Sequence, residues 1–218
     1  MAGLGLGAWG GVGPAAGATL GGTLVLAERG KPSTDLAGAM VWFTPESGAA
    51  PAPPIAAEIV MRDRRFAPRV IAVPVGSTVR FGNADPIRHN VFSVSPGNRF
   101  DLGLYGEGPG RAQRFDRPGL ARIFCNVHRT MSAFVMVLDT PFHTAPDAAG
   151  HFTLSGLPEG PGTLHVWHPR AEAWSRALRV PLADPLVVTL EATLPVVPPH
   201  LDKHGRPYRE PADDERYR

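Results

Sequence analysis

Three side chains able to bind a metal lie within seven residues of one another in the stretch FCNVHRTM (124–131). Cys125, the only cysteine of the chain, offers a thiolate, His128 an imidazole and Met131 a thioether. Such donors favour copper, zinc or iron over magnesium or calcium. A structural zinc site takes four strong ligands, commonly several cysteines, and only one exists here. Two imidazoles, one thiolate and a weak axial thioether make a type 1, or blue, copper centre, so we expect a second histidine from elsewhere.

The second imidazole is expected to be His89, in the stretch PIRHNVFSV (86–94), which follows the predicted strand STVRFGN (77–83). Ligands from two separated strands hold their geometry in both copper oxidation states. Each residue also has an ordinary interpretation, because a lone cysteine is usually a small core residue. A histidine beside a turn is usually a surface group, and a methionine after a loop usually serves packing.

Six further histidines show no ligand pattern. His165 and His168 lie three apart on a predicted strand and so face opposite sides of it. His200 and His204 have helical spacing but lie in a predicted disordered tail. We expect all six to be structural or exposed: His143, His151, His165, His168, His200 and His204.

Short segments with apolar residues at every second position recur along the chain, whereas helical periodicity is hard to find. Predicted strands are 22–28, 39–44, 57–61, 70–75, 77–83, 90–95, 121–125, 133–139, 151–156, 163–168, 177–182 and 186–191. The 25 glycines and 24 prolines are spread between them as turns. This pattern predicts an all-β sandwich or a pair of sandwiches.

The alternation also predicts which side chains of the strand before the ligand loop face the core. Ala121, Ile123 and Cys125 share one face, while Arg122 and Phe124 point away from it. The thiolate would therefore extend an apolar stripe that points into the sandwich.

Over roughly residues 57–139 the chain resembles the cupredoxins, the plastocyanin and azurin family. The resemblance lies in FAPRVIAVPVGSTVRFGNADPIRHNVFSV (66–94), followed by FDRPGLARIFCNVHRTMSAFVMVLD (115–139). The order cysteine, two residues, histidine, two residues, methionine is the amicyanin spacing. The resemblance implies a Greek-key sandwich over 55–140.

The same resemblance implies roles for individual residues. His89, Cys125 and His128 would bind one copper ion, with Met131 as the long axial ligand. Asn90 would brace the site by hydrogen bonds around the sulfur. Arg129 stands where many relatives have proline, and we expect it to help dock a partner.

The segments on either side carry a weaker resemblance. DAAGHFTLSGLPEGPGTLHVWHP (147–169) and GGTLVLAERGKPSTDLAGAMVWF (21–43) look like the two halves of a carboxypeptidase regulatory-like, or transthyretin-like, β sandwich. We therefore expect residues 19–46 and 141–193 to form one small sandwich with the copper domain inserted in or joined to it. Trp42 and Phe124 are candidates for the contact between the two.

The two ends of the chain are expected to lie outside both domains. Residues 1–18 are glycine-rich with an apolar stretch and the small-residue site Ala16-Gly17-Ala18, which indicates a signal-peptide remnant without its basic region. A disordered leader is the alternative. The charged, aromatic-poor tail 194–218 is expected to be disordered.

These expectations favour a periplasmic or secreted one-electron carrier between redox proteins, with His128 at an exposed edge as the exit route. Copper storage, delivery or sensing is the alternative, and a structural module that has lost copper is a third interpretation. We expect no enzyme, because the trinuclear site of a multicopper oxidase needs His-x-His pairs and the sequence contains none. A net charge of +2 does not favour nucleic acid; we expect a monomer without a membrane span.

Overall fold

In the computed structural model residues 17–208 are described, and the regular secondary structure over this range consists of strands. Seventeen strands form four sheets. The predicted all-β class is confirmed. Residues 1–16 and 209–218 lie outside the described residues, and with them most of the predicted signal-peptide remnant and the end of the predicted tail.

Two of the sheets face each other and form what we call the central sandwich (residues 56–138). One sheet contains, in spatial order, β10 (Gly108–Phe115), β7 (Ser77–Asn83), β4 (Ala56–Arg62) and β5 (Arg65–Ala67). The other contains β6 (Val70–Pro74), β12 (Ser132–Leu138), β11 (Gly119–Phe124), β8 (His89–Ser93) and β9 (Phe100–Tyr105). Both sheets contribute to one core, in which Ile59, Phe81, Ile123 and Val135 are fully buried.

The strands on either side of the central sandwich pair with one another in two further sheets, called here the flanking sheets. One contains β14 (His151–Leu157), β1 (Ala18–Glu28), β17 (Leu186–Glu191) and β2 (Lys31–Ser33). The other contains β13 (His143–Thr144), β3 (Met40–Pro45), β15 (Gly160–Trp167) and β16 (Trp174–Val180). β1, which precedes the central sandwich, runs antiparallel to β14 and parallel to β17, both of which follow it. A transthyretin-like identity for these sheets stays a prediction.

The flanking sheets enclose a core of their own because their strands alternate in burial. Leu20, Leu24 and Leu26 of β1 are buried, and Phe43 of β3 packs into the same cluster. β15 approaches this cluster so closely that a Cβ at Gly162 would lie 2.2 Å from Cζ of Phe43. Only glycine fits at that position, so Gly162 has a packing reason.

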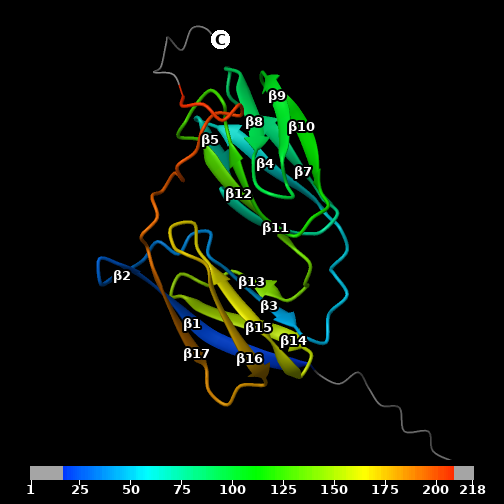
Figure 1. Cartoon of the computed structure of the whole chain (residues 1–218), viewed down its shortest axis with the longest axis vertical. Helices are drawn as coiled ribbons and strands as arrows, with labels where there is room; N and C mark the ends of the chain where they lie inside the picture. Colours follow the sequence, from blue (N-terminus) through cyan, green and yellow to red (C-terminus); the bar gives the residue numbers. More distant parts are fainter. Residues whose placement is uncertain (1–16, 209–218) are drawn as a thin grey trace, which may run out of the picture.

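A third apolar cluster joins the two halves of the molecule. Every residue of β12 is buried, because its two faces pack against different neighbours. Ala133, Val135 and Val137 face the core of the central sandwich. The intervening residues join a cluster shared with β3 and β15, whose members are Met40, Phe134, Met136, Leu138 and Trp167. Figure 1 shows the two halves stacked along the long axis. The shared cluster lies where β12 meets β3 and β15.

Of the two residues proposed for that contact, one lies there. Trp42 packs against the shared cluster. Phe124 instead lies on the outer face of β11, where its ring faces Phe92 at 6.0 Å and His200 at 3.9 Å. The expectation for Phe124 was wrong because its contact comes from a segment thought to be disordered.

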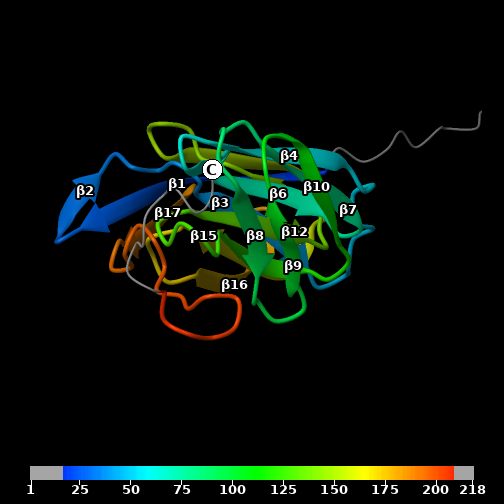
Figure 2. The same cartoon turned by 90° about the horizontal axis from the view of Figure 1, so that it is seen from above.

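That segment, residues 194–208, is called the C-terminal segment below. It leaves β17 and runs past both halves to the end of the central sandwich, coloured orange to red in Figure 1 and seen at the edge of the molecule in Figure 2. The N–H of Leu194 donates to the carbonyl of Arg170 at 2.9 Å, and the Arg69 guanidinium donates to the carbonyl of Val196. The predicted disorder is therefore wrong for residues 194–208, because their partners lie far away in sequence.

Some strands of the structure were not predicted from the sequence. β9 and β10 were not expected, since FDLGLY and GPGRAQRF contain glycine or proline and lack clear alternation. Among the described residues, no helix is long and apolar enough to cross a membrane. A periplasmic or secreted location stays a prediction.

Candidate metal centre

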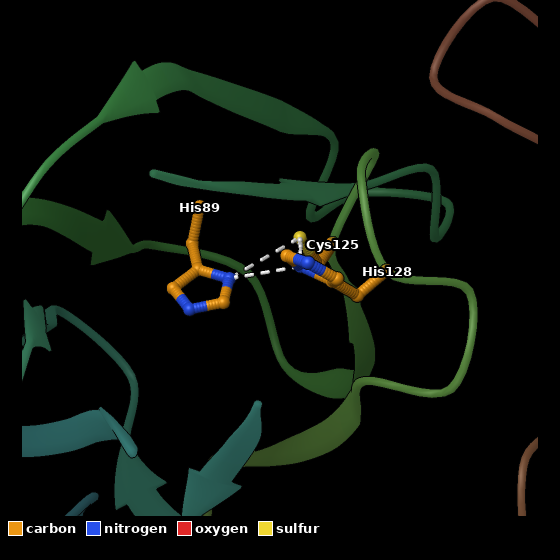
Figure 3. Close-up of side chains that lie close together, drawn as sticks. All are labelled: His89, Cys125 and His128. Carbon is orange, nitrogen blue, oxygen red and sulfur yellow. Dashed lines mark hydrogen bonds between the residues drawn. The ribbon is translucent and has the colours of Figure 1, made fainter. Parts of the chain in front are cut away.

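The structure brings His89, Cys125 and His128 together at one end of the central sandwich (Figure 3). Nδ1 of His89 lies 3.1 Å from Nδ1 of His128, and Sγ of Cys125 lies 3.9 Å from the former and 3.8 Å from the latter. Among residues 17–208 this is the one such group of three His, Cys, Asp or Glu side chains.

Two elements supply these side chains. His89 is the first residue of β8, and Cys125 directly follows β11, which pairs with β8 at Phe124 and Phe92. The loop 125–131 then turns back into β12 and is closed by the N–H of Met131, which donates to the carbonyl of His128 at 3.0 Å. Adjacent strands therefore fix the distance between His89 and the loop.

The predicted face of β11 is confirmed. Ala121, Ile123 and Cys125 are all completely buried in the central core. Arg122 is exposed on the opposite face. The thiol thus reaches the site from the apolar interior, where few groups compete for it.

Asp85 holds the imidazole of His89 in place. Its Oδ2 lies 2.7 Å from Nε2 of His89, and its carboxylate also accepts hydrogen bonds from the backbone N–H groups of Asp63 and Arg64 at 2.7 and 3.0 Å. When Nε2 carries the proton that this carboxylate accepts, Nδ1 presents its lone pair to the site, as a metal-binding imidazole requires. Asp85 was not identified from the sequence; the available signal was a carboxylate four positions before His89.

The pKa values of these groups are set by burial and hydrogen bonds. Burial acts to raise the pKa of Asp85, but hydrogen bonds from the Arg64 backbone, His89 and the Asp63 backbone outweigh it and hold the pKa below its usual value. Burial lowers the pKa of His89 despite the neighbouring carboxylate, which favours the neutral, metal-binding imidazole. Burial raises the pKa of the Cys125 thiol, so a metal ion must displace its proton on binding.

Asn90 links β8 to the ligand loop, and its bracing role around the sulfur stays a prediction. Its Oδ1 accepts a hydrogen bond from the N–H of Asn126 at 3.3 Å, and its Nδ2 donates to Oδ1 of Asp101 at 2.7 Å. The N–H of Val127 points at Sγ of Cys125 from 3.4 Å. These contacts fix the backbone next to the sulfur.

The C-terminal segment completes this network. The hydroxyl of Tyr208 donates to the carbonyl of Cys125 at 3.0 Å. The N–H of Lys203 donates to Oδ1 of Asn126 at 2.9 Å, while its Nζ lies 2.6 Å from Oδ2 of Asp101. Neither Tyr208 nor Lys203 was identified from the sequence, because no local pattern ties residues about 80 positions apart.

Three further expected site residues lie in the ligand loop itself. Met131 is 1% exposed in the central core beside the ligand loop, and its axial role stays a prediction. Arg129 is exposed next to His128. His128 itself is half-buried and its Nε2 is buried, and its expected role as the exit route stays a prediction.

None of the six other histidines joins the three-residue group. His168 is 1% exposed, and its Nδ1 accepts a hydrogen bond from the N–H of Arg170. His165 stacks on Trp42, and His200 stacks on Phe124. These three contacts are structural, as expected.

The donor set fits a soft or borderline metal ion. First-row metal bonds such as those of zinc are about 2.0 Å to imidazole nitrogen and about 2.3 Å to thiolate sulfur. Three donor atoms separated by 3.1, 3.8 and 3.9 Å can all lie at such distances from one ion. Two imidazoles with one thiolate are the set typical of blue copper.

Comparison with protein-family models found no match, and comparison with curated protein sequences found none either. Among solved structures, a purple cupredoxin from Nitrosopumilus maritimus is similar over 38% of this chain and 99% of its own, with 22% identity and a TM-score of 0.33. A reduced mutant form of amicyanin is similar over 46% of this chain and 99% of its own, with 19% identity and a TM-score of 0.37. A copper-containing nitrite reductase from Thermus scotoductus SA-01 is similar over 44% of this chain but 24% of its own, with 26% identity and a TM-score of 0.35.

Proposed function

We propose that the protein binds one copper ion in a type 1 centre and carries single electrons between redox proteins. One observation carries this proposal: Nδ1 of His89, Sγ of Cys125 and Nδ1 of His128 converge on one point. His89 and Cys125 are fully buried there, and strands of one sheet hold them.

Copper, when bound, supplies the one-electron chemistry by alternating between Cu(II) and Cu(I). The residues of this chain hold the donor atoms still. Asp85 orients His89, while Asn90 and Tyr208 both hold the peptide group between Cys125 and Asn126. Met131 is our candidate for the weak axial ligand. A site that hardly moves when its charge changes favours rapid electron transfer.

The experiment is to add Cu(II) to the purified apoprotein and to record the visible spectrum. We expect an intense blue or purple thiolate-to-copper band in the parent protein. The variant Cys125→Ser removes the sulfur and should lose the band. Absence of the band in the parent, or its persistence in the variant, would refute the type 1 assignment.

Copper storage or delivery is a second candidate, favoured by the buried Nε2 of His128, which leaves that imidazole nitrogen without an exposed edge. A storage or delivery protein should be colourless with Cu(I) only and should surrender its metal quickly to a chelator. A carrier should retain copper under the same conditions and be oxidised and reduced reversibly.

A further inference from the structure

A groove of about 790 Å³ lies between the outer face of the central sandwich and the C-terminal segment. Val94, Leu120 and Phe124 line it from the strands and the loop beside them, and residues 199–205 form the opposite wall. Val94 is 45% exposed there, an apolar side chain left open to solvent. Below we call this the C-terminal groove.

Phe124 connects the groove to the metal centre, because it lines the groove and is the residue before Cys125. Phe124 is covalently joined to Cys125 but points to the other side of the strand. Its ring stacks on His200, with centroids 3.9 Å apart and planes 11° from parallel. A molecule in the groove would therefore lie against the stacked rings of Phe124 and His200, beside the residue whose sulfur faces the metal centre.

The His128 side offers no such direct approach, because Nε2 of His128 is buried. A partner that approaches Arg129 would not touch the imidazole nitrogen. The groove is thus in more direct contact with the residues of the metal centre than the surface around Arg129 is.

The charges around the groove are mainly positive. Arg99 and Arg122 both line it, and neither guanidinium has an ion-pair partner in the part of the chain that the structure describes. Lys203 is already paired with Asp101. Asp202 is the acidic residue of the groove wall, and its carboxylate is occupied by the guanidinium of Arg206 and by the N–H groups of residues 204 and 206.

We propose that the C-terminal groove docks an acidic surface segment of the redox partner protein, whose carboxylates pair with Arg99 and Arg122. This inference rests on the proposed carrier function. Two unpaired guanidiniums beside an apolar floor suit a weak, charge-steered contact, the kind that electron carriers use. An electron leaving by this face passes from Cys125 into Phe124 and its stacked partner, and no bond or proton need move.

The docking test does not require copper. Hexaglutamate, an acidic peptide probe, is titrated into the ¹⁵N-labelled apoprotein. We expect the amide signals of Val94, Arg122 and Lys203 to shift. Arg99→Gln/Arg122→Gln should weaken binding about tenfold, the loss of roughly one charge-assisted hydrogen bond. The control Arg176→Gln/Arg179→Gln removes two exposed arginines of β16 and should bind as the parent does.

Three results would overturn the proposal: no binding, shifts centred on Arg129, or equal losses in the groove variant and the β16 control. The apoprotein experiment also separates this proposal from the copper assignment, whose failure appears as a missing colour band.

A second measurement uses the copper-loaded protein. Ferricyanide, an anionic one-electron oxidant, is mixed with the reduced protein in a stopped-flow instrument at low salt. The groove variant should react about threefold more slowly, because charge steering is lost. A larger loss in Arg129→Gln than in the groove variant would place the contact at the ligand loop and contradict the proposal.

Discussion

Asp85 shows how a residue outside the ligand set determines what a ligand can do. It connects the turn after β4 to His89 through three hydrogen bonds. Because the carboxylate accepts a hydrogen bond from a protonated Nε2, it favours the tautomer with a free Nδ1. The orientation of His89 thus depends on a residue four positions earlier.

Substitution of this residue gives a first prediction. Asp85→Ala should weaken copper binding about 10- to 100-fold, the usual effect of losing a partner of a metal-ligating histidine. Affinity is measured by competition with a chromophoric chelator. Asp85→Asn keeps an acceptor oxygen and should recover most of the affinity, whereas Asp116→Ala, at an exposed carboxylate paired with Arg114, should change nothing. Full affinity in Asp85→Ala would show that His89 is held by packing alone.

The C-terminal segment supports the candidate metal centre from outside the ligand loop. It has no regular strand, yet it contacts the loop after β11 through Tyr208 and Lys203 and covers Phe124 with His200. These are contacts between sequence-distant groups, which stabilise the ligand loop without belonging to it. The segment therefore belongs with the half of the molecule that contains the candidate metal centre.

Truncation after Thr193 should lower the free energy of unfolding of the copper-loaded protein by about 2 to 4 kcal/mol. This range sums two hydrogen bonds of about 1 kcal/mol each and one aromatic contact. Chemical denaturation followed by fluorescence measures it. Truncation after Tyr208 keeps the segment and is the matched control, so the two truncated proteins should differ in stability by this amount. Equal stability of the two truncated proteins would contradict a supporting role for residues 194–208.

Over the whole molecule, buried histidines couple stability to pH. Burial lowers the pKa of His143, His165, His168 and His200 below the value of an unfolded chain. Below about pH 6.5 the unfolded chain therefore binds more protons than the folded one. The stabilisation is fully present above that pH and is lost as the pH falls through the lower folded values.

The free energy of unfolding of the apoprotein should accordingly decrease between pH 7.5 and pH 5. His168 alone can contribute at most about 1.4 kcal/mol per pH unit, the limit for one proton. His168→Gln should give a shallower dependence in urea denaturation at each pH, whereas His204→Gln, at an exposed position, should keep the parent's slope. A steeper slope in His168→Gln would reverse the sign we assign.

The arrangement of the halves follows from β12, which is buried on both faces. The sequence AFVMVL is apolar throughout, so it shows no alternation of polar and apolar residues that would separate the two faces of β12. A sequence of this kind predicts a strand covered on both sides but does not name what covers it. In the structure the second face of β12 is covered by Met40 and Trp167, which lie outside the central sandwich in sequence.

The sequence by itself determined the strand class and pointed to His89, Cys125 and His128 as candidate metal ligands, because alternation and ligand spacing are local properties. The inward face of Ala121, Ile123 and Cys125 followed from the same alternation. Only the tertiary structure decided that Asp85 orients His89, that Nε2 of His128 is buried and that the C-terminal segment covers Phe124. Those facts depend on contacts between distant segments, whose free energy comes from burial and hydrogen bonding in the folded chain and leaves no periodic pattern in the sequence.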